Sequence, residues 1–235
     1  MSKNFVVYTA ITNNKDILKE NQCTLDADFF AFLDTPQKSE TWTIREASSE
    51  FADPRRNAKV QKILSHHYFP DYEYSLWIDG AVELQVPVGT LVEKYLKDAD
   101  IAFFKHPVRN CLYKEAEVCK ELKLDDPEII DKQMKKYRSE SFPEEFGLAE
   151  ATVLLRRHTP KVKEFNELWW KEIKYGSRRD QLSMFYALWK TGLKYTFFPG
   201  QVQNDPKDPL KNGNPYTKWY KHTYFKDEDF ISIQH

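Results

Sequence analysis

Short apolar runs that alternate with helix-forming stretches are the feature of this sequence that most restricts its fold. The runs are apolar throughout, as expected for strands buried on both faces of a sheet. Alternation of strands and helices favours a mostly parallel sheet covered by helices. We therefore predict a Rossmann-like α/β fold with a mixed, mostly parallel sheet flanked by helices, whose strands cover Phe5–Ile11, Phe29–Leu33, Tyr74–Ile78, Ile101–Lys105, Thr152–Arg156 and Tyr195–Phe198.

Capping residues mark several helices between these strands. Thr159 followed by Pro160 is typical of a helix start, and Gly176 is typical of a helix end. Pro127 opens another helix that extends towards Tyr137. These boundaries place helices where the sheet needs cover.

The chain length limits the number of domains. A chain of 235 residues fits one α/β domain, so we predict a single domain over residues 1–235. Residues 199–235 are rich in Pro, Gly, Asn, Lys and Tyr. Long loops are uncommon in compact domains unless they are functional, so we expect this segment to be a C-terminal loop or tail over the active site.

Charge and hydropathy exclude several classes of function. The formal net charge is −1, so no general positive field would attract nucleic acid or an anionic membrane. No segment approaches the roughly 20 apolar residues of a membrane-spanning helix, and the start shows no targeting signal. The three cysteines lack metal-site spacing, which favours reduced thiols. We expect a cytoplasmic protein.

The segment Tyr74–Ile78, Asp79, Gly80 is the most informative motif, because an apolar strand runs directly into an aspartate and a glycine. Ligands of open α/β sheets lie beyond the carboxyl ends of strands. A carboxylate there suits Mg²⁺ or Mn²⁺ bridging a diphosphate, and glycine permits close backbone approach. The alternative is an Asp-Gly turn between two strands, because residues 82–86 alternate like a following strand.

Residues 55–68 read as one helix that begins with cations. At 100° per residue, Arg56 and Lys59 share a face with Val60 and Ile63. Because burying an unpaired cation is costly, we expect both cations to face a polar cleft where a diphosphate or carboxylates pair with them. A solvated surface turn, or ion pairs with neighbouring acids, is the alternative.

A second helix start carries the candidate catalytic group. Ser177 precedes Asp180 by three residues, so the two could form a capping box. The functional interpretation is that Asp180 projects into a sugar site, where a carboxylate orients the acceptor, serves as base or stabilises an oxocarbenium-like transition state. Arg178 and Arg179 could pair with phosphate or with acidic neighbours.

Taken together, ordered motifs over residues 5–190 resemble the glycosyltransferase-like family that includes plant mucilage-related and turgor-related proteins and microbial relatives. The resemblance implies a GT-A fold and sugar transfer. It departs from the GT-A Asp-x-Asp signature, because Ala81 stands where the second aspartate usually lies. The motifs are Val7–Thr12, Arg56–Lys59, Leu76–Gly80, Phe104–Arg109, Tyr113–Ala116, Gly147–Glu150, Leu155–His158, Trp169–Glu172 and Ser177–Gln181.

This resemblance implies roles for further residues. The end of the first strand would hold the nucleoside, and the end of the second would take the uracil or ribose. Those donor-side residues are Thr9, Ala10, Thr12 and Asp34, joined by Arg56, Asn57, Lys59, Asp79 and Gly80. The sugar or acceptor side would comprise His106, Arg109, Glu150, Arg157, Arg179 and Gln181. A further metal ligand should come from the tail, where His222 is preferred and His235 is the other choice.

The sequence thus predicts a glycosyltransferase that depends on Mn²⁺ or Mg²⁺ and moves a sugar from a nucleotide-sugar donor, a UDP-sugar, to a glycan or glycoconjugate acceptor. Asp79 and His222 would hold the metal, and Asp180 would act at the anomeric centre. Two rivals remain open: a metal-dependent hydrolase or nucleotidyltransferase on the same fold, and a non-catalytic glycan-binding module. We expect no nucleic-acid partner and no membrane span.

Overall fold

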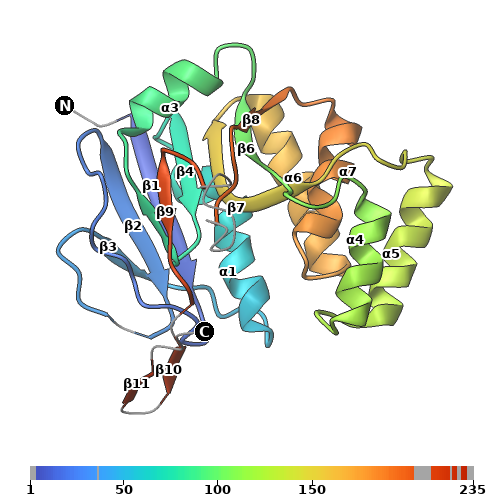
Figure 1. Ribbon diagram of the computed structural model, residues 1–235, viewed down its shortest axis with the longest axis horizontal. Coiled ribbons are helices and arrows are strands. Elements are labelled where there is room, and N and C mark those ends of the chain that lie inside the picture. Colours follow the sequence, from blue (N-terminus) through green and yellow to red (C-terminus); the bar gives the residue numbers. More distant parts are fainter. Residues whose placement is uncertain (1–3, 36, 204–212, 223, 227–228, 232–235) are drawn as a thin grey trace.

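A seven-stranded sheet forms the centre of the protein in the computed structural model, which describes all residues except 1–3, 36, 204–212, 223, 227–228 and 232–235. The strand order is β3-β2-β1-β4-β7-β6-β8 (Figure 1). The strands are β1 (Phe5–Ile11), β2 (Ala27–Leu33), β3 (Thr43–Glu46), β4 (Tyr74–Ile78), β6 (Ile101–Lys105), β7 (Ala149–Arg157) and β8 (Tyr195–Phe198).

Strand direction determines which residues meet at each edge of this sheet. β1 is parallel to β2 and β4, β2 is parallel to β3, and β6 is parallel to β8. β7 is antiparallel to both of its neighbours, β4 and β6. The start of β7 therefore lies at the same edge as the ends of the other strands. This mixed, mostly parallel sheet flanked by helices confirms the predicted α/β fold class.

Apolar residues on both faces of the strands give the sheet two cores. Along β1, Val6 and Tyr8 belong to one cluster, and Val7 and Ile11 belong to the other, as the alternation of side chains requires. The first cluster packs against a layer of helices seen on one side of the sheet in Figure 1. These helices are α1 (Pro54–Ile63), α4 (Leu112–Glu121), α5 (Pro127–Ser139), α6 (Pro160–Tyr175) and α7 (Gln181–Thr191).

The opposite face is covered by α3 (Val88–Tyr95) and by the C-terminal segment. Strand β5 (Val82–Leu84) follows β4 and pairs antiparallel with β9 (Thr217–Trp219) in a separate two-stranded sheet. Tyr216 is buried here, and its hydroxyl lies 2.6 Å from that of Tyr95. Residues 216–219 of the tail thus pack against the main domain. A final hairpin pairs β10 (Tyr224–Lys226) with β11 (Asp229–Ile231).

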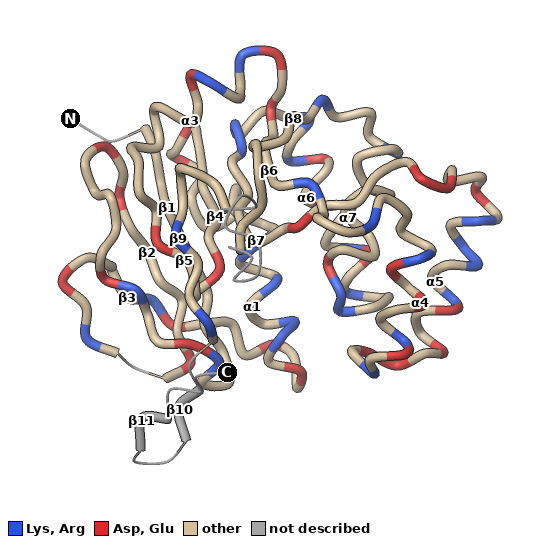
Figure 2. The backbone as a smooth tube through the Cα atoms, in the orientation of Figure 1, with Lys and Arg blue, Asp and Glu red and all other residues tan. Residues whose placement is uncertain are grey.

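Local signals explain the helix boundaries. The carboxylate of Asp53 caps α1 by accepting from the Arg55 backbone nitrogen at 3.0 Å, and Thr159 caps α6 through Val162 at 3.3 Å. The predicted single helix over residues 55–68 is interrupted at Leu64, which separates α1 from the short α2 (Ser65–Tyr68). None of the described helices has the length and apolarity needed to cross a bilayer. Figure 2 shows positive and negative residues interspersed along the chain, in keeping with its balanced charge.

Candidate active site

Asp79 is the first residue after β4, at the edge where the parallel strands end. Its backbone nitrogen donates to the Thr152 carbonyl of β7 at 2.9 Å, and its carbonyl accepts from Val82 at 2.9 Å, which closes a turn. The side chain is 35% exposed. Its Oδ1 atom accepts from the Trp77 indole at 2.7 Å and from the Lys62 ammonium at 3.5 Å. Asp79 therefore occupies both a turn and a charged site.

Two lysines from α1 converge on Asp180. Lys62 Nζ lies 2.8 Å and Lys59 Nζ lies 3.0 Å from the same oxygen, Asp180 Oδ2. The side chains are largely shielded from water, with exposures of 5% for Lys62, 17% for Lys59 and 9% for Asp180. Lys62 thus bridges Asp79 and Asp180. Lys59, which was predicted to face the site, pairs with Asp180, whereas the cation that reaches Asp79 is Lys62, which was not predicted although it follows Lys59 by one helical turn.

Burial and mutual attraction set the charges of this group. Burial alone would lower the pKa of Lys62, but Asp180 and then Asp79 outweigh it and raise this pKa above its ordinary value of 10.5. Burial lowers the pKa of Lys59 to about 8, because Asp180 offsets it only in part and Lys62 adds repulsion. Burial would raise the pKa of Asp180, yet Lys59, Lys62 and Arg179 hold that pKa well below its usual range.

Asp180 is placed by the turn between α6 and α7. It stands directly before α7 in a helical conformation, without a side-chain capping bond, and its carbonyl accepts from the Trp169 indole at 3.1 Å. The predicted capping-box alternative is wrong, because the Ser177 hydroxyl donates to Asp125 at 2.7 Å and accepts from the Arg179 backbone nitrogen at 3.1 Å. The Asp180 carboxylate is therefore free to pair with the lysines.

A buried arginine fixes the end of α1. Arg156 has no exposed surface and donates to the carbonyls of Lys62 at 2.6 Å and Ile63 at 3.0 Å, and it contacts the Tyr8 hydroxyl. These carbonyls belong to the last turn of α1 and lack partners within the helix. Because Arg156 comes from β7 and Tyr8 from β1, the sheet holds the helix end that carries Lys62.

Glu150 approaches the site from the start of β7. The register between β6 and β7 shifts at Phe103/Phe104, where Glu150 pairs with Phe104, and such bulges often re-aim side chains near active sites. Among the described residues, no hydrogen-bond partner reaches its buried Oε2 atom. Burial raises the pKa of Glu150, and the negative charge of Asp79 adds to this against a backbone bond from Val202. The predicted Glu150 thus lies in the electrostatic range of Asp79.

His106 and Arg109, both predicted on the sugar or acceptor side, lie together around Glu115. Arg109 Nε lies 2.5 Å from Glu115 Oε2, and His106 Nε2 lies 3.8 Å from the same oxygen. His106 Nδ1 accepts from the Arg109 backbone at 3.0 Å, and burial lowers the His106 pKa although Glu115 opposes this. Glu115 is 3% exposed and was given no role, although it belongs to one of the family-like motifs. Arg179 donates to Gln181 at 2.8 Å, so both predicted residues lie beside Asp180.

The predicted nucleoside-binding residues lie in the last part of β1 or directly after β1 and β2. Thr9 and Ala10 are buried in β1, and the Thr9 hydroxyl has no hydrogen-bond partner among the described residues. Thr12 donates to the carbonyl of the first α1 residue at 2.8 Å. Asp34 is exposed and accepts from the Asn13 backbone at 2.5 Å. Gly80 fits closely, because an added Cβ would lie 2.7 Å from an Ile11 side-chain atom.

Two predicted donor-binding residues have other roles in the structure. Arg56 donates to the carbonyls of Ile173 and, at 2.9 Å, of Gly176, at the end of α6. Asn57 is buried and bonds both backbone groups of Phe51, accepting at 2.9 Å and donating at 2.8 Å. Unpaired carbonyls at a helix end attract a guanidinium, which draws Arg56 away from the cleft. Of the three α1 residues predicted to face the donor, the structure brings Lys59 to Asp180.

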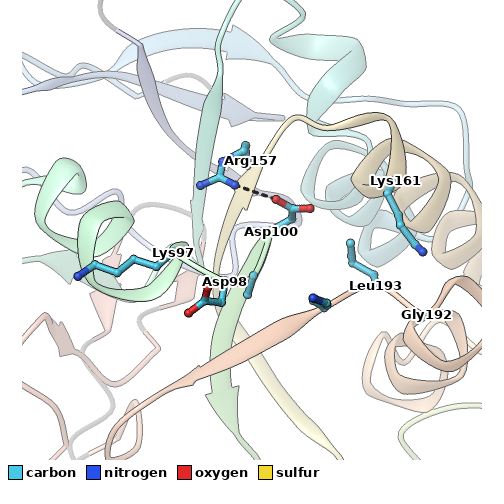
Figure 3. Close-up of a pocket in the computed structure, with 9 residues that line it drawn as sticks. Lys97, Asp98, Asp100, Arg157, Lys161, Gly192 and Leu193 are labelled. Atoms are coloured by element: carbon cyan, nitrogen blue, oxygen red, sulfur yellow. Dashed lines mark hydrogen bonds and ion pairs between the residues drawn. The ribbon is translucent and has the colours of Figure 1, made fainter.

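Arg157 also departs from its predicted place on the sugar side. It pairs in register with the first residue of β4, so it lies at the opposite end of that strand from Asp79. There Arg157 forms an ion pair with Asp100 at 3.0 Å beside a cavity of about 450 Å³ (Figure 3). Lys97 and Lys161 line this cavity but point away from each other in Figure 3. Arg157 lies away from the predicted sugar side because β7 runs antiparallel to β4.

His222, in the C-terminal segment, pairs with Asp16 in the loop after β1. Its Nδ1 atom lies 2.9 and 3.0 Å from the two carboxylate oxygens of Asp16. The Tyr220 backbone nitrogen donates to the Ala81 carbonyl at 2.8 Å, which extends the pairing of β5 with β9 towards Asp79. The alternative ligand, His235, lies outside the described residues.

The donor atoms near Asp79 suit a divalent cation in kind. They comprise the partly exposed Asp79 carboxylate and a buried carboxylate oxygen of Glu150 without a described partner. The His222 imidazole is held by Asp16, and the ligand atoms of Asp79, Glu150 and His222 do not all lie within 4.8 Å of one another. Elsewhere, His66, His67 and Glu167 form a compact group of potential ligand atoms. However, His66 Nδ1 faces the Asn166 amide nitrogen at 3.2 Å, so its Nε2 carries the proton and donates to Glu167. Hydrogen bonds therefore account for the closeness of His66, His67 and Glu167.

Two plant proteins are similar to part of this sequence. The probable hexosyltransferase MUCI70 of Arabidopsis thaliana is 35% identical over 162 residues, covering 64% of this chain and 28% of that protein. Alkaline ceramidase TOD1 of the same plant is 24% identical over 155 residues, covering 61% and 34%. The chain thus spans about a third of the length of these relatives.

Solved structures of glycosyltransferases also align with the fold. The galactosyltransferase LgtC, in complex with donor and acceptor sugar analogues, aligns with a TM-score of 0.48 and 10% identity over 92% of this chain and 86% of that one. A glycosyltransferase involved in glycosylation of the PBCV-1 major capsid gives 0.45 and 10% over 76% and 77%. The sequence model of the TOD1/MUCI70 glycosyltransferase-like domain matches residues 30–202. This chain belongs to the TOD1/MUCI70 glycosyltransferase-like domain family.

Proposed function

We propose that this protein is a metal-dependent glycosyltransferase that moves a sugar from a UDP-sugar to a glycan or glycoconjugate acceptor. The observation that carries the proposal is the joining of Asp79 to Asp180 through Lys62 at the edge where the parallel strands end. Family membership supports sugar transfer as the reaction class. The single-domain arrangement over 1–235, with 199–235 covering the site, is part of the proposal.

The lysines of α1 are suited to the donor diphosphate. Lys59 is the less buried of the two and shares its partner Asp180 with Lys62, so its ammonium can turn towards a phosphate without leaving a carboxylate unpaired. Charge-assisted hydrogen bonds to phosphate oxygens are stronger than neutral ones. Thr12 and Asp34, at the ends of β1 and β2, would hold the ribose and base.

Mn²⁺ or Mg²⁺ would be held by Asp79 and His222. When bound, the cation neutralises negative charge on the departing diphosphate. Ala81 offers no second carboxylate, so the remaining ligands would be donor oxygens and water. Lys62 restrains Asp79 from one side through Oδ1, which leaves Oδ2 for the ion.

The sugar-side roles follow from burial and charge. Asp180 stays ionised, and its Oδ2 is taken by two lysines, so it would stabilise positive charge at the anomeric centre through Oδ1. Glu150, whose pKa is raised by burial, and His106, whose pKa burial lowers, suit proton transfer on the acceptor side. The tail would limit the access of water to the donor.

Calorimetric titration of UDP with Mn²⁺ tests the donor site directly. We expect the Asp79→Ala variant to lose at least tenfold in Mn²⁺-dependent UDP affinity. Asp100→Ala is a matched control, because Asp100 is 29% exposed and pairs with a cation at the other end of the sheet. Equal affinity of wild type and Asp79→Ala would overturn the proposed site.

A product assay separates the reaction classes. We expect UDP to be released from a UDP-sugar in a manner that depends on acceptor. A nucleoside monophosphate product would instead indicate nucleotidyl transfer. The similarity to alkaline ceramidase TOD1 adds a specific rival, hydrolysis of a lipid amide, and release of fatty acid from ceramide without any UDP-sugar turnover would refute sugar transfer. Sugar binding that needs neither nucleotide nor metal would indicate a glycan-binding module.

A further inference from the structure

The C-terminal segment runs alongside the turn that contains Asp79. Strand β9 pairs antiparallel with β5, with Val82 opposite Trp219. Before Val82 the chain turns, because the Val82 backbone nitrogen donates to the Asp79 carbonyl at 2.9 Å. The Tyr220 backbone nitrogen donates to the Ala81 carbonyl of this turn at 2.8 Å. The tail thus passes the turn that begins with Asp79 two residues before it reaches His222.

A buried carboxylate holds this imidazole in one orientation. Asp16 is 4% exposed, and both of its oxygens lie within 3.0 Å of His222 Nδ1. An ionised carboxylate accepts hydrogen bonds and cannot donate them. The proton of the neutral imidazole must then sit on Nδ1, which leaves the lone pair on Nε2.

The loop that carries Asp16 is packed directly behind the Asp79 turn. A Cβ added to Gly80 would lie 3.3 Å from the Asp16 Cβ atom. Gly80 thus leaves room for Asp16 to stand beside the metal-binding turn. This contact links the loop after β1, the end of β4 and the tail at one point.

We propose that Asp16 is the positioning residue for His222: it fixes the Nδ1–H tautomer and presents Nε2 to a divalent cation at Asp79. Metal-bound histidines commonly donate their other ring nitrogen to a carboxylate in this way, which sets tautomer and ring orientation. The inference rests on the metal site of the proposed function. It adds a third chain segment, the loop after β1, to that site.

Mn²⁺ affinity in a double-mutant cycle tests the inference. In the presence of UDP, calorimetry on the full chain would compare wild type, Asp16→Asn, His222→Ala and the double variant. Loss of such a partner typically weakens metal binding about 10–100-fold, so we expect that loss for Asp16→Asn. In the His222→Ala background, Asp16→Asn should cause no further loss. Unchanged affinity in Asp16→Asn, or a full additional loss in the double variant, overturns the proposal.

Tyr220→Phe is the matched control for a looser tail. The Tyr220 hydroxyl donates to Glu83 at 2.6 Å, so this variant removes a tail contact without touching the imidazole. We expect it to keep Mn²⁺ affinity within about twofold of wild type. An equal loss in Tyr220→Phe and Asp16→Asn would show that Asp16 merely anchors the tail.

The tautomer of His222 can be read without any variant. In ¹⁵N NMR of the wild type without metal, we expect the proton on Nδ1, and we expect Asp16→Asn to redistribute it towards Nε2. A wild-type Nε2–H tautomer contradicts the inference.

If Asp79→Ala abolishes Mn²⁺ binding but His222→Ala does not, the inference falls and the proposed function stands. If Asp79→Ala leaves binding intact while the Asp16–His222 coupling persists, the proposed function falls instead.

Discussion

Replacing Asp180 by asparagine should destabilise the protein in a way that depends on the two lysines. The substitution keeps the shape of the side chain and removes its charge. Lys62 Nζ and Lys59 Nζ lie 2.8 and 3.0 Å from Asp180 Oδ2, with side-chain exposures of 5% and 17%. Removing one partner of a buried ion pair typically costs about 3–5 kcal/mol, because the remaining charge is left unpaired.

Deprotonation of Lys59 sets a ceiling on this cost. Deprotonating a lysine of ordinary pKa 10.5 at pH 7 costs about 5 kcal/mol, at 1.36 kcal/mol per pKa unit. Because Lys62 keeps Asp79 as a partner, we expect a loss of about 3 kcal/mol. For a domain of this size, that lowers the unfolding midpoint by about 6–12 °C.

The pH dependence and a second substitution make this prediction specific. Without Asp180, the folded state releases the Lys59 proton at a lower pH than the wild type, whose Lys59 pKa is about 8. The unfolded state then binds more protons than the folded variant, so the stability deficit should shrink between pH 7 and pH 9. Adding Lys59→Met should recover part of the midpoint in thermal melts followed by circular dichroism. An unchanged midpoint, or a double variant less stable than Asp180→Asn, would refute the reasoning.

Four further outcomes are expected. Because burial lowers the pKa of Lys59 to about 8, UDP affinity measured by calorimetry should fall about tenfold from pH 7 to pH 9, and this dependence should vanish in Lys59→Met. Gly147→Ala should cost about 3 kcal/mol in chemical denaturation, because φ is +132° and a Cβ would lie 2.2 Å from a phenyl carbon. Gly192→Ala, at φ +58° with the nearest described atom 3.9 Å away, should cost about 1 kcal/mol. Burial raises the pKa of Cys119 to about 11, so this thiol should react with a disulfide reagent more slowly than Cys23, and equal rates would contradict its burial.

The buried strands were predictable because both of their faces are covered. The bounds of β1, β4, β6 and β8 coincide with the apolar runs in the sequence. β2 and β7 begin earlier than predicted, at Ala27 and Ala149. β3 was not predicted, because it is a short edge strand whose residues are largely polar and exposed. No apolar run in the sequence marks such a strand.

The candidate site was predictable only in part, because its charges come from distant segments. Asp79 could be found from its place directly after an apolar strand, and Lys59 from the cost of burying a cation. Lys62 follows Lys59 by three residues, yet its role depends on Asp180, 118 residues further along the chain. Glu115 was missed for another reason: its partner Arg109 lies only six residues before it, but on a loop whose course the sequence pattern does not reveal.

The direction of β7 explains both a residue that reaches the site and one that does not. Two family-like motifs lie at the ends of β7, Gly147–Glu150 at its start and Leu155–His158 at its end. Glu150 and Arg157, one from each motif, were both predicted to lie on the sugar side. Apolar composition does not reveal strand polarity, and β7 is antiparallel to β4 and β6. Its first residues, including Glu150, therefore join the edge that carries Asp79, while Arg157 lies at the other edge. Had β7 been parallel, Glu150 would lie at the far edge and the carbonyl of Thr152 could not bind Asp79 as it does, so the reversed strand is what completes the acidic side of the site.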